Sequence, residues 1–250
     1  MAAAAWLISD GMLYQAEYAS RLAPAGGALI RAEDGRTISV LYLPNPAARY
    51  TLWYFHGNAE SLGDIEPRLR ALRDLGFAVF AYDYPGYGLS SGRPSEARIY
   101  ASTQAALAYL RQAHGVTPDR ILAFGRSMGG GPAVELAVRQ PVAGLILQSA
   151  FTSVYRVMTR WPLLPFDKFE NLRKIPRVRC PVLVMHGKED HLVTFDHGEA
   201  LFAAAPAPKW HLWSELAGHN DFEVFDGDAY RAALRGLADG IIKGTPTAAQ

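Results

Sequence analysis

One stretch of the chain decides the fold: Ile121-Leu122-Ala123-Phe124-Gly125-Arg126-Ser127-Met128-Gly129-Gly130-Gly131-Pro132. Four apolar residues lead into Gly-x-Ser-x-Gly, and residues 133–138 are then apolar at helical spacing. A strand, a sharp turn and a helix in this order place Ser127 at the corner, the setting of a nucleophile elbow. We expect the turn to hold Ser127 in a strained conformation near the positive end of the helix. Glycine is expected at 125 and 129 because a Cβ there would collide with neighbouring backbone.

Outward from this stretch, predicted strands alternate with predicted helices. The other predicted strands cover residues 28–32, 37–43, 51–55, 77–82, 143–148, 181–185 and 209–213. The other predicted helices cover residues 61–75, 94–114, 195–204 and 222–237. The first two strands flank Asp34-Gly35, which is a hairpin signal. The alternation predicts an α/β fold with a mostly parallel central sheet, an antiparallel N-terminal edge and helices on both faces.

The chain length suits one domain. We expect residues 1–250 to form a single α/β domain, since we find no linker and no internal repeat. Residues 150–178 show no clear strand and are expected to form a short cap or connecting segment, and residues 244–250 a disordered tail.

Composition excludes several classes of partner. The 25 basic and 24 acidic residues balance to a net charge of +1, so no basic excess favours nucleic acid or an anionic membrane. The single cysteine, Cys180, requires no oxidising compartment. The apolar run at residues 1–8 lacks a positively charged start and is too short to span a bilayer. We therefore expect a cytoplasmic protein without a stable membrane anchor.

A serine nucleophile needs a base and a carboxylate that orients the base. In this architecture the order along the chain is Ser, then Asp or Glu, then His. Asp190 follows the strand predicted at 181–185, and His219 follows the strand predicted at 209–213. Both lie beyond the carboxyl ends of their strands, where open α/β sheets form ligand sites.

Other acids and histidines remain alternatives. Glu189 and Asp196 are carboxylates close to Asp190, which we prefer because it is far enough past the strand to turn back toward the site. The histidines that compete with His219 are His114, His191, His197 and His211. His191 and His197 with Asp190 and Asp196 resemble a metal cluster in composition, but their spacing matches no known ligand pattern, so we expect no metal.

The oxyanion formed during acyl transfer needs two hydrogen-bond donors. We expect one to be the backbone N–H of Met128, which follows the nucleophile. The second is expected from Asn58, in the loop His56-Gly57-Asn58 after the strand at 51–55. His56 is expected to brace that loop, and a plain polar turn is the alternative.

These residues resemble the α/β-hydrolase superfamily, above all its bud-emergence-protein-like branch, which includes membrane-attached protein depalmitoylases. The similarity covers about residues 52–225 and depends on five motifs, found at residues 55–59, 82–96, 125–131, 181–190 and 218–221. It implies a triad of Ser127, Asp190 and His219, and it suggests that Tyr87-Gly88 lies beside the acyl site. Membrane-attached relatives carry an N-terminal membrane helix or a cysteine cluster, and neither is present in this sequence.

Together these observations predict a serine hydrolase, without cofactor, that cleaves carboxylic esters or thioesters. The alternatives are a serine peptidase or amidase of the same fold and a ligand-binding protein without activity. In the predicted cap, one group of apolar residues is expected to supply the wall of a small acyl pocket, with Trp161 in contact with substrate, while part of the group packs on the sheet: Phe151, Val154, Val157, Met158, Trp161, Leu163, Leu164 and Phe166. A plain connection whose aromatic residues belong to the core is the alternative.

Overall fold

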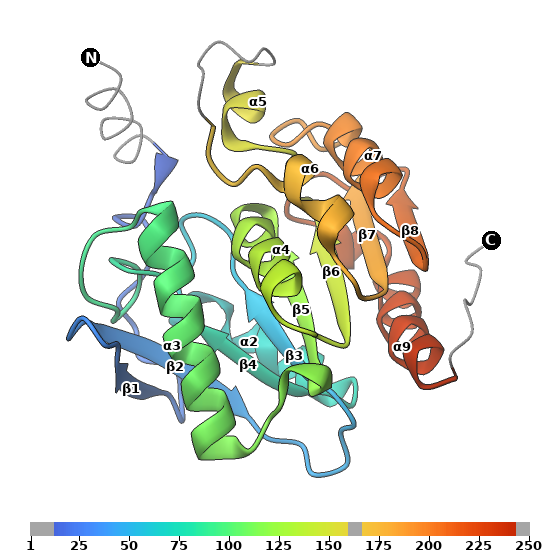
Figure 1. Cartoon of the computed structure of the whole chain (residues 1–250). Helices are drawn as coiled ribbons and strands as arrows, with labels where there is room; N and C mark the ends of the chain where they lie inside the picture. Colours follow the sequence, from blue (N-terminus) through green and yellow to red (C-terminus); the bar gives the residue numbers. More distant parts are fainter. Residues whose placement is uncertain (1–12, 160–166, 244–250) are drawn as a thin grey trace. The chain divides into compact units, whose positions relative to one another are not determined.

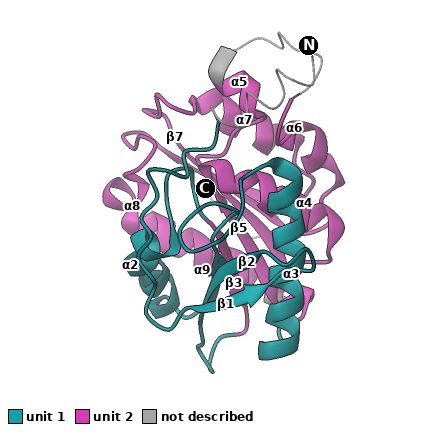
Figure 2. Ribbon diagram, turned by 90° about the vertical axis from the view of Figure 1, so that its left-hand side faces the viewer, with its two compact units in different colours: residues 1–48, 56–116 teal, residues 49–55, 117–250 magenta. Residues whose placement is uncertain are grey.

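The computed structural model describes residues 13–159 and 167–243. The chain divides into two compact units (Figure 2). The first unit comprises Met1–Ala48 and His56–Val116, and the second comprises Arg49–Phe55 and Thr117–Gln250. The predicted single domain is not tested by this division and stays a prediction. Trp161 and the expected tail at 244–250 lie outside the described residues.

The first unit contains the antiparallel strands. Its strands are β1 (Ala28–Arg31), β2 (Thr37–Leu43) and β4 (Ala78–Tyr82). β1 and β2 form the predicted hairpin, with Gly35 at φ 80° in the turn, where a residue without a Cβ is favoured. β2 also pairs antiparallel with β4, so the expected antiparallel N-terminal part of the sheet is confirmed.

Two helices cover these strands. α2 (Leu62–Asp74) and α3 (Glu96–His114) lie on opposite faces of the strands in Figure 1. Ser61 and Asp64 form a capping box at the start of α2. Ser95 accepts a hydrogen bond from the Arg98 N–H at the start of α3, and Gly115 ends that helix at φ 66°.

The second unit is a parallel α/β layer. Its strands are β3 (Thr51–Phe55), β5 (Ile121–Arg126), β6 (Gly144–Gln148), β7 (Val182–Gly187) and β8 (Lys209–Ser214). They pair in the order β3-β5-β6-β7-β8, and every one of these pairs is parallel. All residues of β3, β5, β6 and β7 are buried, which explains why these strands read as continuous apolar runs.

Helices cover both faces of this layer. The main helices are α4 (Gly130–Arg139), α7 (Phe195–Ala204) and α9 (Gly227–Lys243). A Cβ at Gly125 would meet Ala133 of α4, whereas the neighbouring Phe124 packs 6.5 Å from Tyr230 of α9. Since successive strand residues point to opposite faces, α4 and α9 lie on opposite sides of β5. The mostly parallel α/β fold predicted from the sequence is therefore confirmed.

The last predicted helix, over residues 222–237, is wrong in its continuity and its end. The structure has a short α8 (Phe222–Phe225), then α9 from Gly227 to Lys243. Asp226 has φ −123° and ψ 27°, which is outside the helical range. Aspartate followed by glycine is a poor helix-forming pair, so the chain breaks here although its apolar spacing continues.

Candidate active site

The turn after β5 has the geometry of an elbow. Ser127 has φ 51°, in the left-handed region that non-glycine residues seldom adopt, and a short 3₁₀ turn (Ser127–Gly129) leads into α4. A Cβ at Gly125 would lie 2.6 Å from the Gly129 oxygen and from the Gly130 Cα. Glycine at 125 is therefore required for strand and helix to approach this closely. Conformations of this kind cost roughly 1–3 kcal/mol and recur at functional sites.

His219 lies between Ser127 and Asp190. Its Nε2 is 3.0 Å from the Ser127 Oγ, and its Nδ1 is 2.7 Å from Asp190 Oδ2. A ring nitrogen facing a carboxylate carries the proton, so Nδ1 is the donor and Nε2 can accept from the serine hydroxyl. The three side chains come from loops after β5, β7 and β8, all in the second unit. The structure thus brings together the three residues that the sequence analysis selects.

Asp190 is buried and held as a carboxylate. Burial alone raises the pKa of Asp190, but hydrogen bonds from His186 and His219 lower it by more, so the net pKa lies below its usual range. Its Oδ1 also accepts from the N–H groups of Leu192 (3.0 Å) and Val193 (2.8 Å). An anion fixed in this way stabilises the imidazolium form of His219.

His186 is a site residue that the sequence analysis missed. Its Nε2 lies 2.7 Å from the Val193 oxygen and 3.4 Å from Asp190 Oδ2, and its side chain is fully buried. Both neighbours are acceptors, so Nε2 carries the proton. The available signal was its place at the end of β7, four residues before Asp190. His186 therefore braces the loop that presents the acid.

The competing carboxylates point elsewhere. Glu189 is exposed and lies 3.8 Å from His191 Nε2. Asp196, in the first turn of α7, accepts from the Thr194 hydroxyl at 2.5 Å. The hydrogen bond to His219 Nδ1 therefore distinguishes Asp190 from both alternatives.

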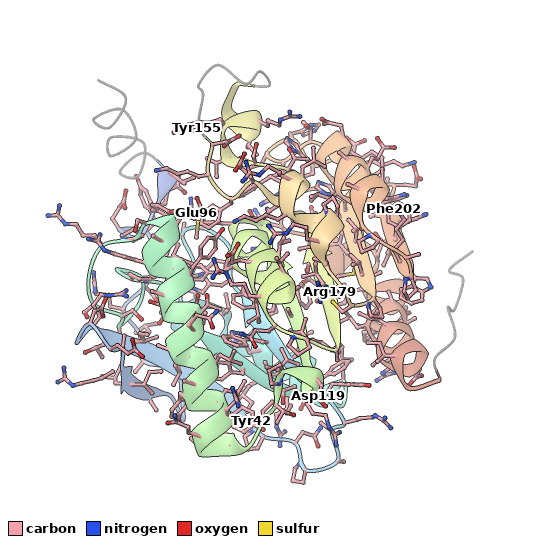
Figure 3. All side chains as sticks on the ribbon, viewed as in Figure 1. Tyr42, Glu96, Asp119, Tyr155, Arg179 and Phe202 are labelled. Atoms are coloured by element: carbon pink, nitrogen blue, oxygen red, sulfur yellow. The ribbon has the colours of Figure 1, made fainter. Side chains whose placement is uncertain are left out.

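The competing histidines have other neighbours. His197 is buried, accepts at Nδ1 from the Thr152 N–H, and has its pKa lowered by burial. His211 stacks on Trp213 at 4.6 Å and lies edge-on, at 4.8 Å, to Phe202 of α7. Phe202 is labelled in Figure 3. His114, in the first unit, packs 4.2 Å from Tyr42.

Within the part of the chain that the structure describes, acidic, histidine and cysteine side chains form no cluster for a metal ion. Across residues 13–159 and 167–243, no group of three or more of these side chains is placed to hold an ion. Metal-independent activity stays a prediction.

The expected oxyanion donors lie in different units. Met128, in the second unit, is the second residue of the 3₁₀ turn that leads into α4. Asn58, in the first unit, has its side chain fully engaged: Nδ2 donates to the Leu13 oxygen (2.7 Å), and Oδ1 accepts from the Gln15 N–H (3.0 Å) and the Tyr87 hydroxyl (2.5 Å). These hydrogen bonds tie the Asn58 side chain to its neighbours, and the donor role of its main-chain N–H stays a prediction.

Tyr87 packs against the loop that carries Asn58. Its side chain is fully buried, burial raises its pKa well above the usual value, and its ring lies 5.6 Å from that of His56. His56 Nδ1 is 2.8 Å from the Gly57 oxygen, which agrees with the bracing role expected for this histidine. In the structure Tyr87 contacts Asn58, and the expected contact with substrate stays a prediction.

The described parts of the cap segment contribute several residues to the core. This segment contains α5 (Val154–Thr159), α6 (Asn171–Lys174) and a 3₁₀ turn (Ile175–Arg177). Phe151 and Val154 are buried, and so is Phe169, whose ring lies so close to α4 that a Cβ on Gly131 would be 2.2 Å from it. Phe151 and Val154 are therefore core residues, which both the pocket hypothesis and the plain connection allow, and the acyl pocket stays a prediction. Trp161, Leu163, Leu164 and Phe166 lie outside the described residues.

The chain is similar to known proteins of one family. The family model described as "Serine aminopeptidase, S33" matches residues 46–172, about half of the chain. Human α/β hydrolase domain-containing protein 17B is 40% identical over 201 residues, which cover 79% of this chain and 70% of that protein. The 17C protein of Xenopus laevis is 42% identical over 200 residues, which cover 78% of this chain and 64% of the relative.

The fold also matches solved structures. An esterase from Pyrococcus furiosus superposes with a TM-score of 0.72 at 17% identity, covering 85% of this chain and 91% of that one. Among the described residues, no helix is both long and apolar enough to cross a membrane. On the extent of the family match and the 40% identity to human protein 17B, the chain belongs to the α/β-hydrolase family.

Proposed function

We propose that this hydrolase is a serine enzyme that cleaves carboxylic esters or thioesters through an acyl-enzyme on Ser127. The observation that carries the proposal is the continuous row of hydrogen bonds from Ser127 Oγ to His219 (3.0 Å) and from His219 to Asp190 (2.7 Å). A binding pocket has no need of a strained serine, a base with a defined tautomer and a buried carboxylate in one line.

The reaction proceeds in two halves. Ser127 Oγ bonds to the acyl carbon while its proton moves to His219 Nε2, and Asp190 stabilises the imidazolium that forms. The developing oxyanion accepts from the Met128 N–H, and the Asn58 N–H is the candidate second donor. The carbon–oxygen or carbon–sulfur bond then breaks, and the leaving group takes the proton from Nε2.

Water completes the second half. His219 Nε2 removes a proton from water while the water oxygen bonds to the acyl carbon. The bond between the acyl carbon and Ser127 Oγ then breaks, and Oγ takes the proton from Nε2 to regenerate the free hydroxyl. The products are a carboxylic acid and an alcohol or thiol. The balance requires no oxidant, reductant or cofactor. We extend the proposal to small acyl substrates met in the cytoplasm, without nucleic acid partners.

A serine peptidase or amidase is the second candidate, because the matching family model is described as a serine aminopeptidase. The same three residues serve both reactions. An amide differs in its leaving group, whose nitrogen must be protonated before the bond breaks. The two candidates are therefore distinguished by turnover.

The test combines labelling with a substrate panel. A fluorophosphonate probe should label the wild-type chain, and Ser127→Ala should abolish the labelling. The panel pairs a p-nitrophenyl ester, a thioester and a p-nitroanilide of the same acyl group. We expect kcat/KM for the ester and thioester to exceed that for the anilide. Preference for the anilide would support the peptidase, and a wild type without labelling or turnover would overturn both.

A further inference from the structure

The loop that carries His219 is held on its N-terminal side by the loop of the acid. The Ala217 oxygen accepts from the Glu189 N–H at 3.1 Å, and the Ala217 N–H donates to Ser214 Oγ at 2.9 Å. Ala217 itself is fully buried. These contacts fix the chain two residues before His219, beside Asp190. They leave open what fixes the chain after His219.

The buried side chain of Arg126 contacts the chain on the C-terminal side of His219. Arg126 is the last residue of β5, directly before Ser127, and only 3% of it is exposed. Its Nη2 donates to Asn220 Oδ1 at 2.5 Å and, more weakly, to the His219 oxygen at 3.4 Å. The guanidinium thus joins the strand of the nucleophile to the main chain of the base.

We infer that Arg126 is a positioning residue, which holds the His219 main chain in place so that Nε2 stays within reach of Ser127 Oγ. The inference rests on the proposed function. Because Gly125 faces α4, Arg126 leaves the strand on the opposite face, away from the helix that begins at the elbow. It therefore acts through His219 rather than on the reacting atoms.

An arginine is suited to this task. A buried charge is expensive unless it is paired, and charge-assisted hydrogen bonds are stronger and shorter than neutral ones. Its forked head offers several donors in a fixed plane, so one side chain can hold two acceptors on adjacent residues. The loop is thereby held on both sides of His219: at Ala217 by the loop of the acid, and at Asn220 by the strand of the nucleophile.

The experiment compares Arg126→Ala, Asn220→Ala and the double variant with wild type. Asn220 is exposed, so its truncation should leave the fold intact. We expect Arg126→Ala to lower kcat about 10²-fold, the loss that a displacement near 1 Å produces, with KM within about threefold. Asn220→Ala should lower kcat about tenfold, and the double variant should be no slower than Arg126→Ala, because both remove one shared interaction. Arg231→Met, at an exposed ion pair on α9, is the control and should match wild type.

Chemical rescue separates positioning from general structural support. Guanidinium ion at millimolar concentration should restore part of the kcat of Arg126→Ala and none of that of Asn220→Ala. Thermal melting checks that each variant is folded. If Arg126→Ala does not fold, Asn220→Ala decides: a tenfold loss supports the inference and wild-type kcat overturns it.

If the variants fold and keep wild-type kcat, or if the two single losses multiply fully in the double variant, the inference about Arg126 is overturned. The proposed function would then still stand. A wild-type chain that neither labels with fluorophosphonate nor turns over would overturn the proposed function and, with it, this inference.

Discussion

Gly187→Ala should damage catalysis although glycine 187 has no chemistry of its own. Gly187 ends β7, and a Cβ built there would lie 2.0 Å from the Ala217 oxygen and 2.6 Å from the Ala217 carbonyl carbon. Real Cβ atoms essentially never approach closer than 3.0 Å, so the Ala217 carbonyl must retreat by about 1 Å. Ala217 is fully buried and lies two residues before His219, so the displacement should pass to the imidazole.

A misplacement of this size near a catalytic group costs about 10²-fold in rate. We therefore predict that Gly187→Ala lowers kcat/KM for p-nitrophenyl butyrate by about 10²-fold, and lowers Tm as well. The matched control is Gly236→Ala on α9, where a Cβ meets nothing within 4 Å. This control should keep full activity. It should also gain roughly 0.5–1 kcal/mol of stability, because glycine inside a helix is less stable than alanine by about that amount.

The assay measures kcat/KM and fluorophosphonate labelling at a temperature where all three proteins are folded. Labelling reports on Ser127 reactivity per folded molecule, so a loss of stability is separated from a loss of alignment. If Gly187→Ala is folded and labels as fast as Gly236→Ala, the close approach of the two loops does not fix His219, and the reasoning fails.

The other predictions concern the acid, the pH profile, metals and the acyl chain. Asp190→Asn should lower kcat by several orders of magnitude by stabilising the wrong tautomer of His219, whereas Asp196→Asn should stay near wild type; the reverse result would reassign the acid. kcat/KM should rise with pH in a single step, because His219 accepts a proton only when neutral and the pKa of Asp190 is held below its usual range. A flat profile from about pH 5 to about pH 9 would contradict this. EDTA should leave ester turnover unchanged. A loss of turnover with EDTA that zinc restores would refute the prediction of a metal-independent enzyme. Across p-nitrophenyl esters, kcat/KM should peak at acyl chains of about four to eight carbons. Each further methylene adds ~0.8 kcal/mol of binding free energy only while the pocket wall can bury it. Trp161→Ala should weaken the preferred ester more than acetate, and a rate that climbs to palmitate would exclude a small pocket.

Local patterns were sufficient for most of the fold. The strand predicted at residues 51–55 and the helix predicted at 195–204 match β3 and α7 residue for residue. These elements carry their own signals, namely a continuous apolar run or a helical period with clear ends. The helix expected at 222–237 failed because the period continues across Asp226-Gly227, where backbone preference ends the helix.

The site was partly predictable for a related reason. Ser127 lies in a local motif. Asp190 and His219 each follow a strand, and because these strands pair in parallel their carboxyl ends lie at the same edge of the sheet. His186 and Arg126 act through contacts with Val193, Asp190 and Asn220 that depend on how separate loops meet. Sequence spacing does not encode such contacts, so their roles became visible only in three dimensions.

The left-handed backbone of Ser127 has an evolutionary consequence. At φ 51° a serine gives up roughly 1–3 kcal/mol that glycine, free of a Cβ, would largely recover. Selection for thermal stability alone would therefore drive this position toward glycine. A population under relaxed selection for turnover should lose the hydroxyl here early, because the first step away from activity is also a step toward a more stable fold.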